Sequence, residues 1–321
     1  METPTKSLAD LLAESGDDDN DFICSHCGHS QKERFQTCPS CGKRAKNPTL
    51  AEWGKQLPIG IENGDKLIKS FDLVALDWKL EREINQHWAA RRNALTISEY
   101  IGAILAVAIT QVGNHDFTKF KFDKRLVILN RMYQGDIFYM YAYLRLLSVG
   151  YQMSLGNVRC SNCGSEFPFT GDLRTLEIAV IDTPLDLLSK IELRNGFELA
   201  GETRTKLMVK PPMWSMMGSS MPRNGNEAEM FSAMLSNCVV SVEGMPDGTV
   251  ITEREISQFS KLDIEVCQEV LDATLAGPRW EIEGNCEKCQ SPFFHLVDWT
   301  YDSFFALSSR SSRLKKRSRR L

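Results

Sequence analysis

The sequence predicts an α+β protein with an N-terminal zinc ribbon and a helical bundle. We expect the bundle to pack on a small β-rich zinc-knuckle region that carries a central insertion. Three observations lead to this fold class. Eight of the ten cysteines occur in CxxC pairs, helix start signals precede apolar runs, and runs with a period of two lie between them. A chain of 321 residues, 42% of them hydrophobic, is long enough for about two domains.

Cysteine usage and the N-terminal sequence indicate a reducing environment. Disulfide scaffolds are typical of short secreted chains with a signal peptide. Residues 1–15 contain acidic residues and no long apolar stretch, so we expect no secretory signal. The longest apolar run, 100–109, is too short to span a bilayer, and no membrane partner is predicted. Residues 1–21 are expected to form a disordered, acidic N-terminus.

Residues 22–45 predict the first zinc site. Cys24 and Cys27 form one CxxC pair, and after ten intervening residues Cys38 and Cys41 form the next. Four thiolates at this spacing suit a zinc ribbon, in which two turns each direct two sulfurs at one ion. A module this short buries little apolar surface, so metal binding would supply its folding free energy.

The next part of the chain is expected to be a linker followed by helices. Residues 46–64 contain two prolines and three glycines and are predicted to be the linker, with one short helix near residues 50–55. Residues 65–151 are expected to be mainly helical. Thr96 begins a capping box before the apolar run 100–112, which predicts a helix near the centre of a bundle. Asp136 is the predicted N-cap of the helix that follows it.

Two further knuckles lie among predicted strands. Cys160 and Cys163 are expected in the turn of a hairpin, and Cys286 and Cys289 follow a short strand near the C-terminus. Residues 197–209 alternate with a period of two, which is typical of a strand.

The central insertion contains a methionine- and tryptophan-rich segment and more helices. Residues 213–226 form either a loop packed on the body or an exposed, adaptable contact surface. Residues 227–276 are expected to be helical, with a second capping box that begins at Thr252. Cys238 and Cys267 are unpaired and lie in apolar-periodic runs, so we expect buried, inert thiols.

The two distant knuckles leave three arrangements open. Cys160, Cys163, Cys286 and Cys289 would share one Zn²⁺, which would attach the last third of the chain to its middle. The alternatives are two unliganded knuckles or an ion shared with a partner chain. Both knuckles are followed by an apolar run with two phenylalanines, a pattern that favours two halves of one ribbon. Together with the N-terminal ribbon, this gives two predicted structural zinc sites.

The sequence contains no recognisable catalytic motif. There is no HExxH, no GxSxG, no phosphate-binding loop and no Rossmann fingerprint. The chain has five histidines, His26, His29, His87, His115 and His295. None of them stands in a sequence context that indicates a general base. A metal-dependent enzyme would need an open coordination position, whereas four-cysteine sites are closed. We therefore expect no enzymatic activity.

The body, 65–308, is followed by a basic tail at 309–321. This tail carries seven of the lysines and arginines of a chain whose net charge is −4, so the remainder is acidic. The ribbon and the tail favour an alternative function, a nucleic-acid-binding zinc-ribbon protein such as a transcription accessory factor. The acidic body argues against it, because a duplex-binding face normally shows a continuous basic patch. The opposite charges of the two ends also allow self-association.

Four stretches resemble the family of T-even-type phage baseplate and tail-assembly proteins. They are the helix 136–150, the knuckle and strand 160–177, the strand 206–212, and the second knuckle with its Phe-Phe pair, 284–305. The resemblance implies a structural or assembly role without enzymatic activity and contacts with other phage baseplate or tail proteins. It also implies a location in the host cytoplasm during assembly and in the virion tail. The N-terminal ribbon and the basic tail depart from the simple family pattern.

Overall fold

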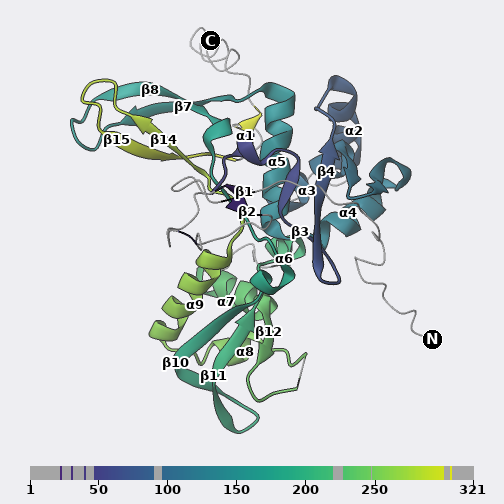
Figure 1. Cartoon of the computed structure of the whole chain (residues 1–321), viewed down its shortest axis with the longest axis vertical. Helices are drawn as coiled ribbons and strands as arrows, with labels where there is room; N and C mark the ends of the chain where they lie inside the picture. Colours follow the sequence, from purple (N-terminus) through teal and green to yellow (C-terminus); the bar gives the residue numbers. More distant parts are fainter. Residues whose placement is uncertain are drawn as a thin grey trace.

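The structure is a computed structural model of the whole chain. It describes residues 22–23, 30–31, 40, 47–89, 96–219, 227–246, 248–299 and 304–305. These residues form a body around helix α5 (Gln134–Val149), an arm made of two hairpins, and an inserted lobe, 189–275 (Figure 1). The predicted acidic N-terminus and basic tail lie outside the described residues.

An antiparallel sheet of four strands forms one side of the body. Its order is β3 (Gln56–Asn63), β4 (Lys66–Leu73), β5 (Ile109–Val112) and β6 (His115–Asp116). The helices beside it are α2 (Trp78–Ala89), α3 (Ile97–Ala108), α4 (Phe122–Asn130) and α5. The helices therefore pack against a sheet as well as against one another. The prediction of a helical bundle for this region did not include the sheet.

The linker prediction for residues 46–64 is wrong. The expected short helix near residues 50–55 is present as α1 (Leu50–Trp53), but the segment continues as β3, in which the side chains of Leu57, Ile59 and Ile61 are buried. The ladder between β3 and β4 is irregular between positions 56 and 61, where the proline and a glycine with φ of 94° lie. Such irregularities accommodate proline and glycine within a strand, so their presence did not interrupt the sheet.

Helix α3 begins where the sequence predicts and ends earlier. The capping box is confirmed, because the Thr96 hydroxyl accepts a hydrogen bond from the Glu99 backbone and the Glu99 carboxylate accepts one from Thr96 N. The helix ends at Ala108, although the apolar run extends to Val112. The last four residues of that run, β5, pair with β4 and bury the side chain of Val112. Tertiary pairing therefore ends the helix within an apolar run.

Helix α5 is buried along most of its length and contains a buried carboxylate. The predicted role of Asp136 as N-cap is wrong, because the helix begins at Gln134 and its N-cap is Tyr133. The Asp136 carboxylate instead accepts hydrogen bonds from Ile59 N at 2.8 Å and Gly60 N at 3.0 Å. It therefore joins the start of α5 to the irregular part of β3.

A buried arginine lies nine residues further along the same helix. Arg145 is fully buried, and its guanidinium donates hydrogen bonds to the carbonyl oxygens of Phe304, Gly150 and Gln152. Burial lowers the pKa of Arg145 to about 10. The side chain therefore stays charged near neutral pH while it joins α5 to the start of the arm and to the last described residues.

The N-terminus of α5 also approaches the backbone of a distant segment. A Cβ atom added to Gly135 would lie 2.1 Å from the Ala276 carbonyl oxygen, and one added to Gly277 would lie 2.8 Å from Gly135 Cα. Gly277 begins β13 (Gly277–Pro278), which pairs with β9 (Ile178–Ala179). Two glycines therefore permit the close contact at which the chain returns from the inserted lobe.

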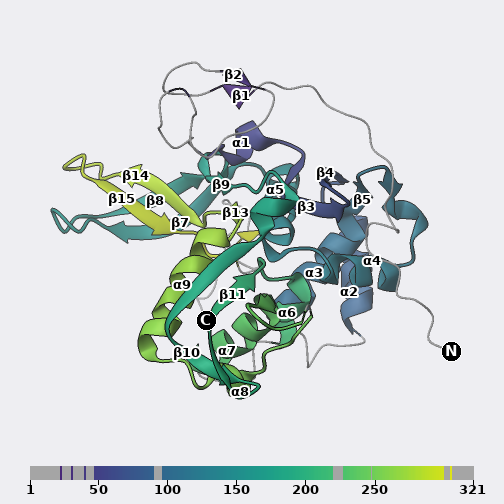
Figure 2. The same cartoon turned by 60° about the horizontal axis from the view of Figure 1, so that its bottom comes forward.

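The inserted lobe has its own sheet and core. Strands β10 (Ser189–Leu199), β11 (Glu202–Val209) and β12 (Val239–Val242) form the sheet. Its helices are α7 (Glu227–Cys238), α8 (Glu253–Ile256) and α9 (Lys261–Thr274). Figure 2 shows the lobe apart from the arm, beneath the body. The lobe corresponds to the predicted central insertion, and the capping box at Thr252 is confirmed.

Within the lobe, the predicted strand 197–209 is a hairpin. It turns at Ala200 and Gly201, whose φ angles are 54° and 80°. Cys238 and Cys267 are buried in the lobe core, and burial raises the pKa of each thiol to about 12. The predicted burial of both thiols is therefore confirmed.

The tryptophan of the methionine-rich segment packs against the body. Trp214 opens α6 (Trp214–Ser219), is buried, and meets the Phe138 ring edge-on at a centroid distance of 5.4 Å. For the described part of this segment, packing is thus favoured over an exposed contact surface. The neighbouring Lys210 ammonium lies 2.9 Å from the Glu62 carboxylate, which accepts a hydrogen bond from Tyr133. These contacts fasten the lobe to the body.

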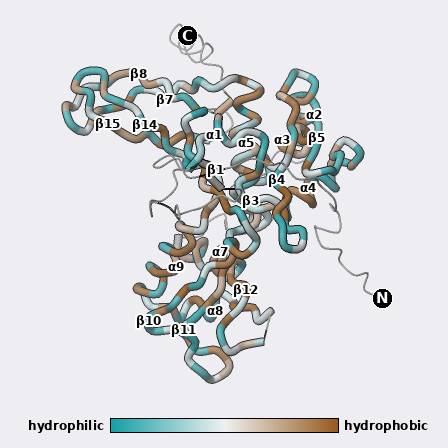
Figure 3. Tube along the Cα trace, viewed as in Figure 1, coloured by the Kyte–Doolittle hydropathy of each residue, from teal (hydrophilic) through white to brown (hydrophobic). Residues whose placement is uncertain are grey.

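Short elements complete the described chain. They are β1 (Phe22–Ile23) paired with β2 (Ser30–Gln31), and the 3₁₀ helices η1 (Phe117–Lys119), η2 (Leu173–Thr175) and η3 (Pro184–Leu187). Figure 3 shows hydrophobic residues where the helices meet the body sheet and hydrophilic residues at the end of the arm. No helix among the described residues is long and apolar enough to cross a membrane.

Replacing Asp136 with asparagine should change how stability depends on pH. Burial raises the pKa of Asp136 to about 7, against the hydrogen bonds from Ile59 N and Gly60 N that lower it. The folded state thus holds this proton more tightly than the unfolded state, whose pKa is near 4. The resulting stabilisation is full below about pH 4 and is lost as the pH rises through 7.

The quantity to follow is the free energy of unfolding of the wild type minus that of Asp136→Asn at the same pH. We expect this difference to fall by about 4 kcal/mol between pH 4 and pH 8. Urea denaturation at intervals of half a pH unit measures this difference. A difference that stays flat over the range would contradict the assignment of a protonated, buried Asp136.

Candidate metal centre

Two hairpins form the arm. They are β7 (Gln152–Arg159) with β8 (Glu166–Asp172), and β14 (Glu281–Asn285) with β15 (Pro292–Leu296). Inward-facing aromatic rings hold them together. The Phe293 ring lies edge-on to Phe169 at 4.9 Å and to Phe167 at 5.7 Å between centroids. Strand alternation thus places Phe167 and Phe169 of the first knuckle pattern and Phe293 of the second between the hairpins.

Each hairpin ends in a knuckle with the same backbone geometry. In the first, Gly164 N donates to the Cys160 carbonyl at 2.9 Å, and Cys160 N donates to the Ser165 carbonyl at 2.9 Å. The second repeats both bonds through Gln290 and Ser291, at 2.8 and 2.9 Å. Gly164 and Gln290 both have positive φ, at 68° and 59°. The repeated turn points the two cysteines of each knuckle in the same direction.

The four sulfur atoms of the two knuckles converge. All of them lie within 4.8 Å of one another, although 122 residues separate the knuckles in the sequence. Cys160 Sγ lies 3.7 Å from Cys289 Sγ, and Cys163 Sγ lies 3.6 Å from Cys286 Sγ. A tetrahedral Zn²⁺ with Zn–S bonds of about 2.3 Å requires sulfur separations of about 3.8 Å. The arrangement therefore fits a zinc ion shared by both knuckles.

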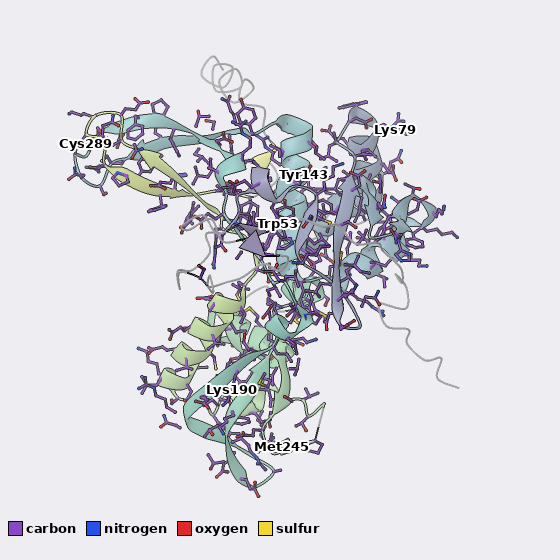
Figure 4. The ribbon with its side chains drawn as sticks, in the orientation of Figure 1. Trp53, Lys79, Tyr143, Lys190, Met245 and Cys289 are labelled. Carbon is purple, nitrogen blue, oxygen red and sulfur yellow. The ribbon has the colours of Figure 1, made fainter. Side chains whose placement is uncertain are left out.

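The donor set and its burial suit a structural ion. Cys160 and Cys286 are buried, Cys289 is half-buried, and Cys163 is exposed. Four thiolates complete a tetrahedral coordination sphere and leave no position for water or substrate. Figure 4 places Cys289 at the end of the arm, far from the body residues Trp53 and Tyr143. A metal bound here would lock the end of the arm.

Two serines beside the sulfurs were not anticipated from the sequence. Ser165 Oγ lies 3.0 Å from Cys163 Sγ and 3.3 Å from Cys286 Sγ, and Ser291 Oγ lies 3.3 Å from Cys289 Sγ. Both serines stand two residues after the second cysteine of their knuckle, so the repeated pattern CxxCxS was the available signal.

The serine hydroxyls favour the thiolate form of the cysteines. The hydrogen bond between the Cys289 and Ser291 side chains is the main cause that lowers the pKa of Cys289 to about 6. A hydrogen bond from Ser165 is the main cause that lowers the pKa of Cys286. The thiolate is the form that binds a metal, and hydrogen bonds to the ligands orient them for coordination.

The histidine nearest the second knuckle is not part of the sulfur cluster. His295 lies on β15, with its ring 6.3 Å from the Phe169 ring. Cys24, Cys27, Cys38 and Cys41 lie outside the described residues. The N-terminal zinc ribbon, and with it the second ion, stays a prediction.

We expect the double variant Cys286→Ser/Cys289→Ser to bind one zinc ion fewer per chain than the wild type, because two of the four thiolates are lost. Its melting temperature should fall by more than about 5 °C. Metal analysis and calorimetry measure both quantities. Cys267→Ala is the matched control, since it removes a thiol in the lobe and should leave the metal content unchanged. Equal zinc content in the wild type and the double variant would rule out the shared site.

Removal of the two hydroxyl groups should weaken metal binding without removing a ligand. We expect Ser165→Ala/Ser291→Ala to lower the zinc affinity by about tenfold or more, the usual effect of losing hydrogen bonds to metal ligands. Competition with a chromophoric chelator measures the affinity. Ser154→Ala, on the outer face of β7, is the control. An affinity equal to that of the control would show that the serines do not support the ligands.

The comparisons with known proteins agree with the resemblance found in the sequence. A family model described as T4 bacteriophage base plate protein matches residues 102–306. The matched span covers well over half of the chain and contains α5, the inserted lobe and both knuckles of the arm. No curated protein and no solved structure matches the chain at a significant level. The chain belongs to the T4 bacteriophage base plate protein family.

Proposed function

We propose that this chain is a zinc-stabilised structural or assembly protein of a contractile phage tail baseplate, which acts through protein–protein contacts. The observation that carries the proposal is the family match over residues 102–306. The matched region includes the two knuckles whose sulfurs converge at the end of the arm. The family supplies the baseplate role, and the convergence supports a metal that stiffens the arm.

The geometry of the site supports a structural use of the metal. The arm has only a small cluster of buried residues at its end, made of Cys160, Cys286 and Phe167, with partly buried neighbours. A cluster of this size contributes little hydrophobic free energy, so a metal bond between the hairpins would hold them together. An arm locked in this way presents a fixed surface to a partner protein.

The chemistry of the described residues supports a role without catalysis. A zinc ion coordinated by four cysteine thiolates has no open coordination position. The most perturbed buried carboxylate, Asp136, has both oxygens bonded to backbone amides of β3. We propose that the chain has no enzymatic activity, in keeping with its family.

We propose other baseplate or tail proteins as partners. Assembly in the host cytoplasm, followed by a place in the virion tail, agrees with this role. Self-association through the oppositely charged ends is a further possible contact, whereas binding of nucleic acid through the basic tail is not favoured. An N-terminal ribbon folded around a second Zn²⁺ by Cys24, Cys27, Cys38 and Cys41 completes the proposal.

The test measures baseplate assembly in the phage that encodes the chain. The gene for the chain is replaced in the phage genome by genes for the variants. We expect Cys286→Ser/Cys289→Ser to abolish or strongly reduce complete baseplates, because the arm loses its fixed shape. Electron microscopy and sedimentation of lysates count the baseplates, and Cys267→Ala is the control that keeps all four ligands. Normal baseplate numbers in a double variant that has lost its zinc would contradict the proposed role of the metal.

A gel-shift assay tests the alternative function. We expect the full chain to give no salt-sensitive shift of duplex DNA at 50 mM salt, because the charge outside the tail is acidic. A shift that is present in the full chain and absent after deletion of residues 310–321 would favour a nucleic-acid-binding protein.

A further inference from the structure

The two outer faces of the arm differ in polarity. On β15, Phe294 and Leu296 point outward, and each side chain is 69% exposed. The outer face of β8 carries Glu166, Pro168 and Thr170 instead. Large apolar residues that are adjacent on an exposed strand indicate a contact surface. We call the outward side of β14 and β15 the apolar face of the arm.

Acidic residues border this face. In the β14–β15 register, Glu283 lies opposite Phe294, and Glu281 lies opposite Leu296. Both carboxylates are exposed, and among the residues that the structure describes neither forms an ion pair. An occupant of the apolar face would therefore combine apolar side chains with positive charge. A second copy of the same face does not meet this requirement, because it would bring like charges together.

The chain itself contains a segment of this composition. Residues 310–321 carry seven lysines and arginines, together with Leu314 and Leu321. The last described residues, 304–305, lie near the arm and precede this segment by four residues. The Phe304 ring packs edge-on against Trp280 at 5.7 Å between centroids, and Trp280 immediately precedes β14. The described chain therefore ends close to the base of the apolar face.

The chain beyond the described residues is long enough to cover the face. Sixteen residues follow Phe305, and in extended form they reach about 50 Å. The five residues of β14 span only about 17 Å. A segment tethered this close has a high effective concentration at the face, which favours it over a separate molecule of equal intrinsic affinity.

We propose that the basic C-terminal segment, 310–321, binds the apolar face of the arm within the same chain. Its lysines and arginines pair with Glu281 and Glu283, and its leucines pack on Phe294 and Leu296. The segment thereby covers an apolar surface that would otherwise stay exposed to water. The attraction is electrostatic in part and weakens as salt screens the charges.

Photo-crosslinking of the full, zinc-loaded chain tests the proposal. The photoreactive residue p-benzoylphenylalanine replaces Phe294, which keeps an aromatic ring at that position. After irradiation, mass spectrometry should find crosslinks to peptides within 310–321. The crosslinked fraction should not depend on protein concentration, because the contact lies within one chain. It should fall by about fivefold or more between 50 mM and 500 mM salt.

Two matched variants make the test specific. The same photoreactive residue in place of Thr170, on the opposite outer face, should give few crosslinks to the tail. The double variant Glu281→Gln/Glu283→Gln, with the photoreactive residue at position 294, should reduce tail crosslinks severalfold while it retains zinc. The proposal is overturned if position 294 gives no tail crosslinks, or no more than position 170. Crosslinks that join two copies and increase with concentration also overturn it, because a neighbouring chain then covers the face.

Discussion

The fold depends on the burial of α5 together with two ionisable side chains of that helix. A helix surrounded by apolar neighbours must satisfy its polar groups inside the protein, because no water reaches them. Asp136 meets this constraint through two backbone amides of β3, and Arg145 meets it through three carbonyls from segments that follow the helix or lie near the C-terminus. The two residues therefore fix where the sheet, the arm and the end of the chain meet α5.

The arm is organised by a different constraint. Its hairpins come from segments on either side of the inserted lobe, and few side chains are buried between them at the knuckles. Bringing such distant segments together costs loop-closure entropy, and the contacts at the end of the arm are too few to offset much of it. Convergence of Cys160, Cys163, Cys286 and Cys289 provides the chemistry for a stronger connection. The backbone turns and nearby serines of both knuckles favour the same ligand geometry.

The inserted lobe can be large without disturbing the arm, because it leaves and rejoins the body at one place. Its return is packed at backbone distance, with Gly135 against Gly277, and Lys210 pairs with Glu62 on β3. The lobe carries its own core, separate from the candidate metal site at the end of the arm.

The sequence alone determined the features whose causes are local. Thr96 and Thr252 predicted helix starts because capping requires only neighbouring residues, and paired cysteines predicted metal ligands because each CxxC turn is built from adjacent residues. The role of Asp136, the strand β3 in the predicted linker and the end of α3 at Ala108 depended on partners far away in the chain. Only the tertiary structure decided these features, because a buried polar group or a strand acquires its partner when distant segments pack together. The same reason explains why four separate sulfurs became one candidate site.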